Sequence, residues 1–282
     1  MNARRWWKWG VAAVILAGLG WQLARIDATG LIALPAPAWT VLLLATALAL
    51  ASYAAFIQAW VVLRGRGETW PAVAPAWWAS LLARYLPGGI GQGALRLGAA
   101  HAAGEGLRNT LERYVAEQLL ACFSATVVAL ALVIAWPVPL PAGLLGALAV
   151  VAILAAAAPL VGKHAGLDVG WNPRALAWML AGHVAMASGF AAFTQSMVAD
   201  ADAATLASAA TAFLIAGVAG LLAIFVPAGL GVRETVLAVL LAPRIGAAQA
   251  ITLALAARLW LIACEIVGWA LVTTLVRRTR DG

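Results

Sequence analysis

Long stretches of apolar residues alternate with short polar segments along the whole chain. Six stretches are uninterrupted and roughly 17 residues or longer, which is enough for a helix to cross a hydrocarbon core of about 30 Å. They cover residues 10–26, 38–63, 114–136, 142–162, 175–198 and 248–273. This pattern predicts an all-α polytopic membrane protein that forms one integral membrane domain over residues 1–282.

Two further apolar regions, 70–110 and 205–243, are interrupted by Pro, Gly and charged residues. The basic residues of the loops fall on one side of the membrane if the six spans alternate and each interrupted region enters and leaves on the same side. Basic loops usually face the cytoplasm, so both termini are expected there. We therefore predict two re-entrant helical hairpins, the first entering from the cytoplasm and the second from outside.

The interrupted regions contain an internal repeat. The segment Tyr85–Gly91 aligns with Phe225–Gly231, in the order aromatic, aliphatic, Pro, small, Gly, aliphatic, Gly. Three predicted spans separate the two copies, and an odd number of crossings reverses the second copy relative to the first. The sequence therefore predicts an inverted-topology repeat with halves of about 1–137 and 138–282, an arrangement that places binding sites near the membrane midplane.

The repeated Pro and Gly residues mark the expected hairpin tips. Pro ends a helix and Gly allows close backbone approach, and broken backbone at this depth is tolerated only where it is buried in protein or lines a wet cavity. The predicted substrate-binding tip residues are Pro87, Gly88, Gly89, Pro227, Gly229 and Gly231. The alternative is a packing kink, because Pro and Gly are common in membrane helices.

Charged residues near the tips complete the candidate binding site. Ionised side chains in an apolar layer usually face a partner or a cavity. The candidates are Arg84, Arg96, Arg233, Glu234 and Arg258. The second leg of each hairpin would direct its amino-terminal N–H groups toward the membrane middle, and arginine can donate two parallel bonds to an oxyanion. We expect a cationic pocket suited to a phosphate or carboxylate.

Four other charged residues are candidates for proton transfer or ion pairing: Glu112, Arg113, Glu117 and Glu265. Arg113 and Glu117 have the i, i+4 spacing of a helical ion pair. Arg258 and Glu265 are seven residues apart and share a helix face. The alternative for Arg113 and Glu117 is an ordinary ion pair at the water interface. For Glu234, Arg258 and Glu265 it is a purely structural buried salt bridge between the two halves.

Composition excludes most other classes of protein. The chain is 65% hydrophobic and 10% charged, whereas a soluble domain is roughly 25% charged. The net charge of +7 comes from short clusters between apolar runs rather than from one helix face, so no nucleic acid is expected. The three His and two Cys residues lack the spacing of metal ligands, and no nucleophile and base have catalytic spacing. We expect no cofactor, no metal and no enzymatic activity.

Two groups of residues resemble a known family. They are Arg84–Gly89 with Arg96 and Leu111–Arg113, and Pro227–Glu234 with Arg258. In these residues the chain resembles the flippase-like membrane domain family, also described as the lysylphosphatidylglycerol synthetase transmembrane region. Ala228 stands where the family pattern often has a second Gly. The resemblance implies an integral protein of the bacterial inner membrane, in several members associated with moving lipid head groups between leaflets. No soluble aminoacyl-transferase domain follows the last predicted span, so synthetase activity is not expected.

These features together lead to one functional hypothesis and two alternatives. The chain is expected to bind or translocate the anionic head group of a phospholipid or polyprenyl-phosphate-linked lipid. It contains no Gly-rich loop ending in Gly-Lys-Ser/Thr, so a gradient, the membrane potential or the lipid itself would supply the driving force. The alternatives are a proton-coupled carrier of a small anion and a non-catalytic scaffold for envelope lipid biosynthesis. Membrane lipids are the expected partners, and a homo-oligomer or an envelope-biosynthesis partner stays open.

Overall fold

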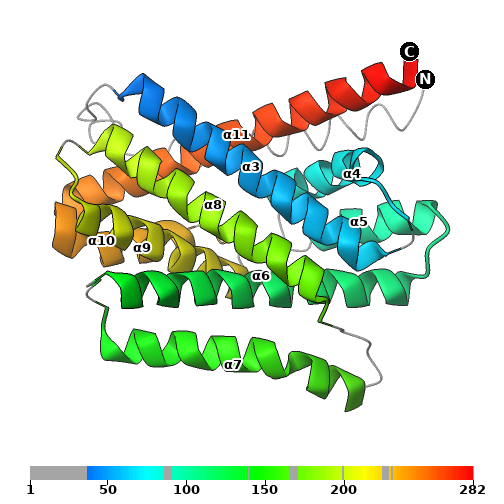
Figure 1. Cartoon of the computed structure of the whole chain (residues 1–282), viewed down its shortest axis with the longest axis horizontal. Coiled ribbons are helices and arrows are strands. Elements are labelled where there is room, and N and C mark those ends of the chain that lie inside the picture. Colours follow the sequence, from blue (N-terminus) through cyan, green and yellow to red (C-terminus); the bar gives the residue numbers. More distant parts are fainter. Residues whose placement is uncertain are drawn as a thin grey trace.

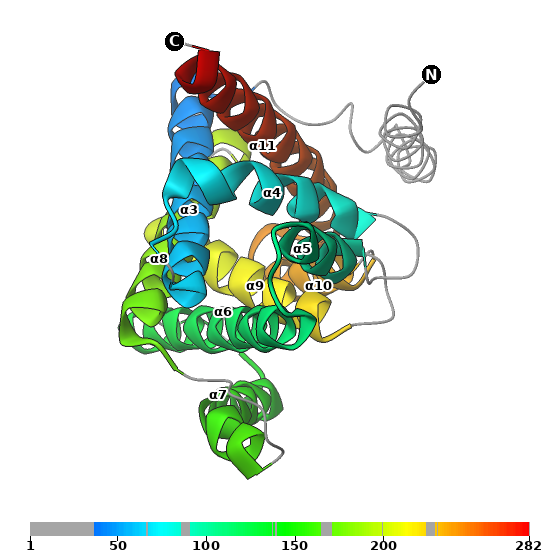
Figure 2. The same ribbon diagram turned by 90° about the vertical axis from the view of Figure 1, so that its right-hand side faces the viewer.

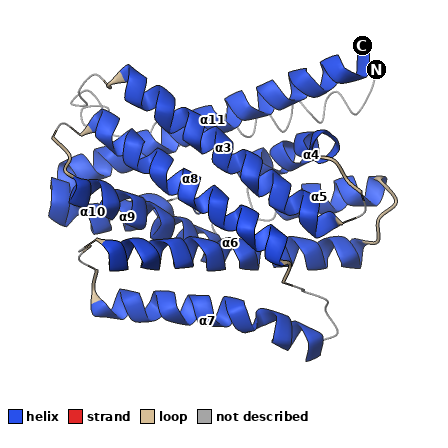
Figure 3. Ribbon diagram, in the orientation of Figure 1, coloured by secondary structure: helices blue, strands red, loops and turns tan. Residues whose placement is uncertain are grey.

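The computed structural model describes residues 37–65, 67–85, 91–136, 138, 140–164, 171–198, 200–223, 229 and 231–281. Within these ranges the regular structure is helical and no strand occurs (Figure 3). The predicted span 10–26 lies outside the described residues. The same holds for the tip residues Pro87, Gly88, Gly89 and Pro227.

The described helices follow one another with short connections. The α-helices are α3 (Trp39–Arg64), α4 (Trp70–Leu82), α5 (Gly91–Ala102), α6 (Leu107–Ala135), α7 (Ala142–His164), α8 (Pro173–Met197), α9 (Ala203–Leu222), α10 (Val232–Ile245) and α11 (Ala247–Asp281). A short 3₁₀ helix, η1 (Ala83–Tyr85), extends α4. In both halves of the chain a packed helix pair, α4 with α5 or α9 with α10, precedes a long helix, α6 or α11.

Six of the described helices are long and apolar enough to cross a membrane: α3, α6, α7, α8, α9 and α11. Five of them coincide with predicted spans, which confirms those spans as long apolar helices. The sixth, α9, lies in the second interrupted region, where the sequence predicted one leg of a re-entrant hairpin. Its 20 residues reach about 30 Å at 1.5 Å per residue, because no Pro interrupts the segment.

The other legs of the interrupted regions are shorter. Helices α4, α5 and α10 have 13, 12 and 14 residues, or roughly 18–21 Å. The two helix pairs are therefore unequal, since only the second contains a helix of spanning length. Helix α6 also begins at Leu107, seven residues before the predicted start of its span, so Glu112 and Arg113 lie inside the helix.

Helices α3 and α8 lie side by side and make the most extensive contact in the described part of the chain (Figure 1). Small residues allow this approach, as is usual between helices in membranes. A methyl group on Gly189 of α8 would lie 3.2 Å from the carbonyl oxygen of Ala45 in α3. Helix α7 packs chiefly against α6 and stands apart from the other helices, while α3, α4, α6, α9 and α11 surround the middle of the molecule (Figure 2).

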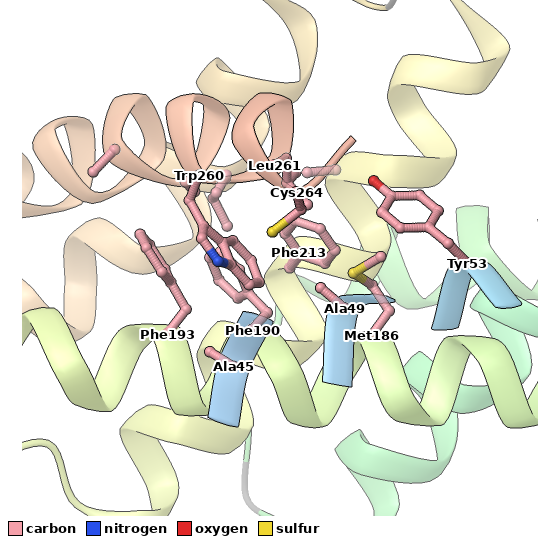
Figure 4. Close-up of a cluster of buried hydrophobic side chains, with 14 of the residues drawn as sticks. Ala45, Ala49, Tyr53, Met186, Phe190, Phe193, Phe213, Trp260, Leu261 and Cys264 are labelled. Carbon is pink, nitrogen blue, oxygen red and sulfur yellow. The ribbon is translucent and has the colours of Figure 1, made fainter. Parts of the chain in front are cut away.

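Stacked aromatic rings join α8, α9 and α11 in the core (Figure 4). The ring of Phe190 stacks on Phe213 with centroids 4.3 Å apart, and Phe193 stacks on Trp260 at 4.6 Å. The indole N–H of Trp260 donates to Oγ1 of Thr46 at 3.1 Å, so its polar group is satisfied. Tyr53 lies at one edge of this cluster, and its hydroxyl group points toward the charged residues of the interior.

Candidate functional site

Three ion pairs between arginine and glutamate join separate elements in the interior. Arg96 of α5 pairs with Glu117 of α6. Arg84 of η1 pairs with Glu265 of α11, and Arg258 of α11 pairs with Glu234 of α10. The predicted charged residues of both halves of the chain therefore form ion pairs that join different helices.

Arg96 is the most completely enclosed of these arginines. Its Nε donates to Oγ of Ser80 at 2.8 Å, and both terminal nitrogens donate to Glu117. Trp60 covers the guanidinium at 4.4 Å, and the indole N–H of Trp77 donates to Glu117 at 3.0 Å. With 2% of its side chain exposed, Arg96 lines neither of the two large cavities described below. These contacts hold Arg96 in a structural ion pair with Glu117, where it does not face a space that a ligand could occupy.

Glu265 is the centre of the second pair and is fully buried. Besides Arg84, it accepts hydrogen bonds from the hydroxyls of Tyr53 at 2.9 Å and Tyr85 at 3.0 Å. A buried carboxylate needs such partners because it has lost its hydration. This network joins α3, η1 and α11.

The third pair holds the start of α10. Glu234 accepts a hydrogen bond from the backbone N–H of Gly231 at 2.8 Å, which satisfies a free donor at the helix start. Its other carboxylate oxygen lies 3.4 Å from Nη1 of Arg258. The Nε and Nη2 groups of Arg258 are buried and have no hydrogen-bond partner among the described residues. One edge of this guanidinium therefore carries two unused N–H groups.

Arg233 differs from the other interior arginines because no described carboxylate lies within ion-pairing distance of it. Its stem lies against two glycines of α9. A methyl group on Gly220 would lie 2.3 Å from Cγ of Arg233, and one on Gly217 would lie 3.3 Å from Nη2. Arg233 lines two cavities together with Arg84 and a smaller cavity together with Arg258. The three arginines thus form a cationic cluster, to which Glu234 and Glu265 supply negative charge.

Two cavities adjoin at this cluster. The inner chamber, of about 190 Å³, reaches from Arg233 of α10 to His183 of α8 and is lined by residues of α3, α4, η1, α5, α6, α8, α9, α10 and α11. The outer chamber, of about 440 Å³, lies between α5, α6, α9 and α10. The chambers share seven lining residues: Arg84, Gln92, Gln118, Cys122, Gly217, Leu221 and Arg233. We call the two chambers together the groove.

The groove brings together the starts of two helices. Gln92 is the second residue of α5 and Arg233 is the second residue of α10, and both line both chambers. The N–H groups at a helix start carry partial positive charge and favour anions. The second helices of the two pairs therefore both present their amino-terminal ends to one space.

The outer chamber has an apolar border on α6 and α9. Val115 and Leu222 line it and are 37% and 54% exposed, respectively. Arg84, Arg233 and Gln118 line the part that it shares with the inner chamber. The chamber thus passes from an exposed apolar edge to a cationic interior.

The remaining predicted residues lie elsewhere or are tied to other partners. Glu112 pairs with Arg108 at 3.0 Å, and Arg113 pairs with Glu105 at 3.2 Å. The spacing of Arg113 and Glu117 suggested a pair between them, but each has a different partner, because Arg96 reaches Glu117 from α5. Arg258 and Glu265 likewise pair with other helices and not with each other.

The described tip glycines adopt conformations that other residues disfavour. Gly229 and Gly231 have φ angles of +63° and +79°. A methyl group on Gly229 would lie 2.7 Å from Cα of Gly220, so the two backbones are in close contact. Gly229 also lines the outer chamber.

Several polar residues that lie at or beside the groove were not among the predicted site residues. Gln92 and Gln118 line both chambers, and Tyr53 and Tyr85 bind Glu265. Their signals were weak: Tyr85 and Gln118 are direct neighbours of the predicted Arg84 and Glu117, whereas nothing in the pattern distinguished Tyr53.

Within the described ranges no three His, Cys, Asp or Glu side chains are placed to hold a metal ion. Cys122 and Cys264 are buried free thiols. Comparison of the chain with protein-family models, curated proteins and solved structures finds no match.

Proposed function

We propose that this chain is an integral membrane protein that binds the anionic head group of a lipid in the groove and passes it between leaflets while the lipid chains stay in the bilayer. The observation that carries the proposal is the position of Arg233. It lines both chambers, has no described carboxylate partner, and lies inward of an exposed apolar border. A lipid needs both a polar site for its head group and an apolar opening for its chains.

The helix starts support the same proposal. Two re-entrant or partly re-entrant hairpins, related as an inverted repeat, would bring the amino-terminal ends of α5 and α10 to the groove from opposite faces. Gln92 and Arg233 are the lining residues on these two ends. In this arrangement the protein lies in a bacterial inner membrane with both termini in the cytoplasm, and translocation needs no catalytic group.

The resemblance to the flippase-like family is part of the proposal. Of the residues that carry it, Arg84 and Arg233 line the groove, and Arg258 and Glu234 lie beside it. Arg96 belongs to a closed structural pair instead. The expected ligands are therefore Arg84, Arg233 and Arg258, whereas Arg96 and Glu117 would hold α5 against α6.

A proteoliposome assay tests translocation directly. Purified protein is reconstituted with a trace of fluorescent anionic lipid, and a membrane-impermeant reductant then measures how much of it reaches the outer leaflet. We expect Arg233→Ala to reduce exchange to near the protein-free level, and Arg174→Ala to exchange like the wild type. Arg174 is the matched control because it is exposed at the start of α8 and lines neither chamber of the groove. Equal exchange by the wild type and Arg233→Ala across a panel of anionic lipids would refute the proposal.

The inner chamber favours a second candidate, a carrier for a small soluble anion. Its volume of about 190 Å³ suffices for such an anion without a lipid tail. Uptake of radiolabelled phosphate or a small carboxylate by the same proteoliposomes, without lipid exchange, would select this function. If neither lipid nor solute moved and a partner co-purified stably, a scaffold role would be the remaining reading.

A further inference from the structure

The unused edge of Arg258 points to the chemistry of the head group. The Arg258 side chain is 8% exposed, and its Nε and Nη2 groups are buried without an acceptor in the described part of the chain. Leaving buried donors unpaired costs free energy, and each such group calls for an explanation. Because Nε and Nη2 form one edge of the planar guanidinium, they are suited to the oxygens of a single oxyanion.

A small cavity lies beside this guanidinium. Its volume is about 20 Å³, and Arg233, Glu234 and Arg258 all line it. That volume holds about one water molecule, and therefore about one oxygen atom of a larger group. The cavity shares Phe213, Arg233 and Leu261 with the inner chamber, so it adjoins the groove at Arg233.

The charges around the groove are not balanced. Among the described residues, four arginines (Arg84, Arg96, Arg233 and Arg258) and three glutamates (Glu117, Glu234 and Glu265) line the groove or the small cavity beside it, or pair with residues that do, which leaves one surplus positive charge. Coulomb interactions are strong where water is excluded, so an occupant with one negative charge neutralises the site. A second negative charge on the occupant would have no counterpart.

We infer that the groove selects a lipid phosphodiester, which carries one negative charge, over a lipid phosphomonoester or diphosphate, which carries more. An oxygen of the phosphodiester accepts hydrogen bonds from the free edge of Arg258, and the surplus charge of the cluster neutralises the group. Glu234 and Glu265 set the selectivity by lowering the charge of the arginine cluster. This inference rests on the proposed function and names its substrate class.

The test compares two lipids that differ by one methyl ester group and, as a result, by this charge. Dioleoyl phosphatidylmethanol is a diester, and dioleoyl phosphatidic acid is a monoester that carries a second charge at about pH 9, above its second pKa. The full chain in detergent is titrated with each lipid, and native mass spectrometry measures the bound fraction. We expect the wild type to bind the diester at least tenfold more tightly than the monoester.

Three variants separate the contributions. Glu234→Gln raises the charge of the cluster by one while its amide oxygen still accepts from Gly231, so we expect the preference to disappear or reverse. Arg258→Lys keeps the charge but loses the planar edge, so diester binding should weaken at least tenfold. Glu68→Gln is the matched control. Glu68 lies in the loop after α3, pairs with Arg64 at the end of that helix, and lines none of the three cavities. It should behave like the wild type.

The outcomes separate this inference from the function on which it rests. Equal binding of both lipids by the wild type, or an unchanged preference in Glu234→Gln, overturns the inference. If Arg233→Ala nevertheless abolishes binding of both lipids, the proposed function stands without it. If neither lipid binds the wild type, or if Arg233→Ala binds both like the wild type, the proposed function itself fails.

Discussion

Replacing Gly220 by Ala tests whether the position of Arg233, rather than its presence alone, creates the binding site. Gly220 lies in α9, and its missing side chain leaves the space that the stem of Arg233 occupies. A methyl group there would lie 2.3 Å from Cγ and 2.7 Å from Cδ of Arg233. The substitution leaves every charge of the site in the sequence and changes only where one of them can lie.

The expected magnitudes follow from these distances. Carbon atoms in contact are about 3.5–4.0 Å apart, so the stem of Arg233 must move by more than about 1 Å. A strained rotamer would cost about 0.5–1.5 kcal/mol, whereas Ala in place of Gly favours a helix by about 1 kcal/mol. The two effects nearly cancel, so we expect the stability of Gly220→Ala to stay within about 1 kcal/mol of the wild type. Lipid affinity should fall at least tenfold, or about 1.4 kcal/mol, as Arg233 leaves the groove.

Two assays on the same preparations check this expectation. Thermal denaturation in detergent measures stability, and lipid titration by native mass spectrometry measures affinity. Gly146→Ala is the matched control, because Gly146 lies within α7 and a methyl group there would meet nothing within 4 Å. It should gain helix stability without any loss of lipid binding. If Gly220→Ala bound anionic lipid as tightly as the wild type, the assignment of Arg233 as the head-group ligand would be wrong.

Three further predictions concern stability. Glu265→Ala leaves Arg84 without its buried partner and should destabilise the protein by about 3 kcal/mol, whereas the double variant Arg84→Met/Glu265→Leu should regain most of this loss. Thermal denaturation compares the two variants, and wild-type stability of Glu265→Ala would contradict the assignment. Gly182→Ala places a methyl group 2.4 Å from the ring of Phe56, so poorer packing of α3 against α8 should destabilise the protein by about 1–3 kcal/mol. An unchanged transition temperature in the same assay would contradict this expectation. The hydrogen bonds from Thr205 lower the pKa of Asp202. This carboxylate therefore stabilises the start of α9 to its full extent at pH values above the ordinary aspartate pKa of about 4, and the stabilisation is lost as the pH falls through the lower pKa of the folded state. Amide hydrogen exchange at Thr205, corrected for intrinsic rates, should therefore be faster in Asp202→Ala at neutral pH, and equal protection in both proteins would count against the cap.

Much of the fold could be predicted because it depends on local pattern. An apolar stretch of sufficient length must satisfy its own backbone hydrogen bonds in a membrane, and a helix does so within the segment. Five of the described spanning helices were located in this way. The prediction was poorer at α9, which contains Gly217 and Gly220 and lies in the region 205–243 that was predicted to form a re-entrant hairpin. The helix continues through both glycines, and their small size makes room for Arg233.

The partners of the charged residues were harder to predict because most of them are distant in sequence. Arg84 and Glu265 are 181 residues apart, and no spacing rule connects them. The i, i+4 spacing of Arg113 and Glu117 was misleading, since Ser80 and Trp77 help to form a buried site in which Arg96 binds Glu117. A local pair at the surface contributes little, so tertiary contacts override it.

The amino-acid sequence by itself determined that this chain forms long apolar helices, and it marked the arginines and glutamates that lie among them. Both the helices and the marked charges follow from the free-energy cost of placing polar groups in an apolar layer. Each segment bears this cost by itself, so it can be assessed from the local sequence. Only the tertiary structure decided that Arg96 is closed within an ion pair while Arg233 lines an open groove. That difference arises from the other helices: α6 supplies a carboxylate to Arg96, whereas Arg233 lies against two glycines of α9 and has no carboxylate within ion-pairing distance in the described part of the chain.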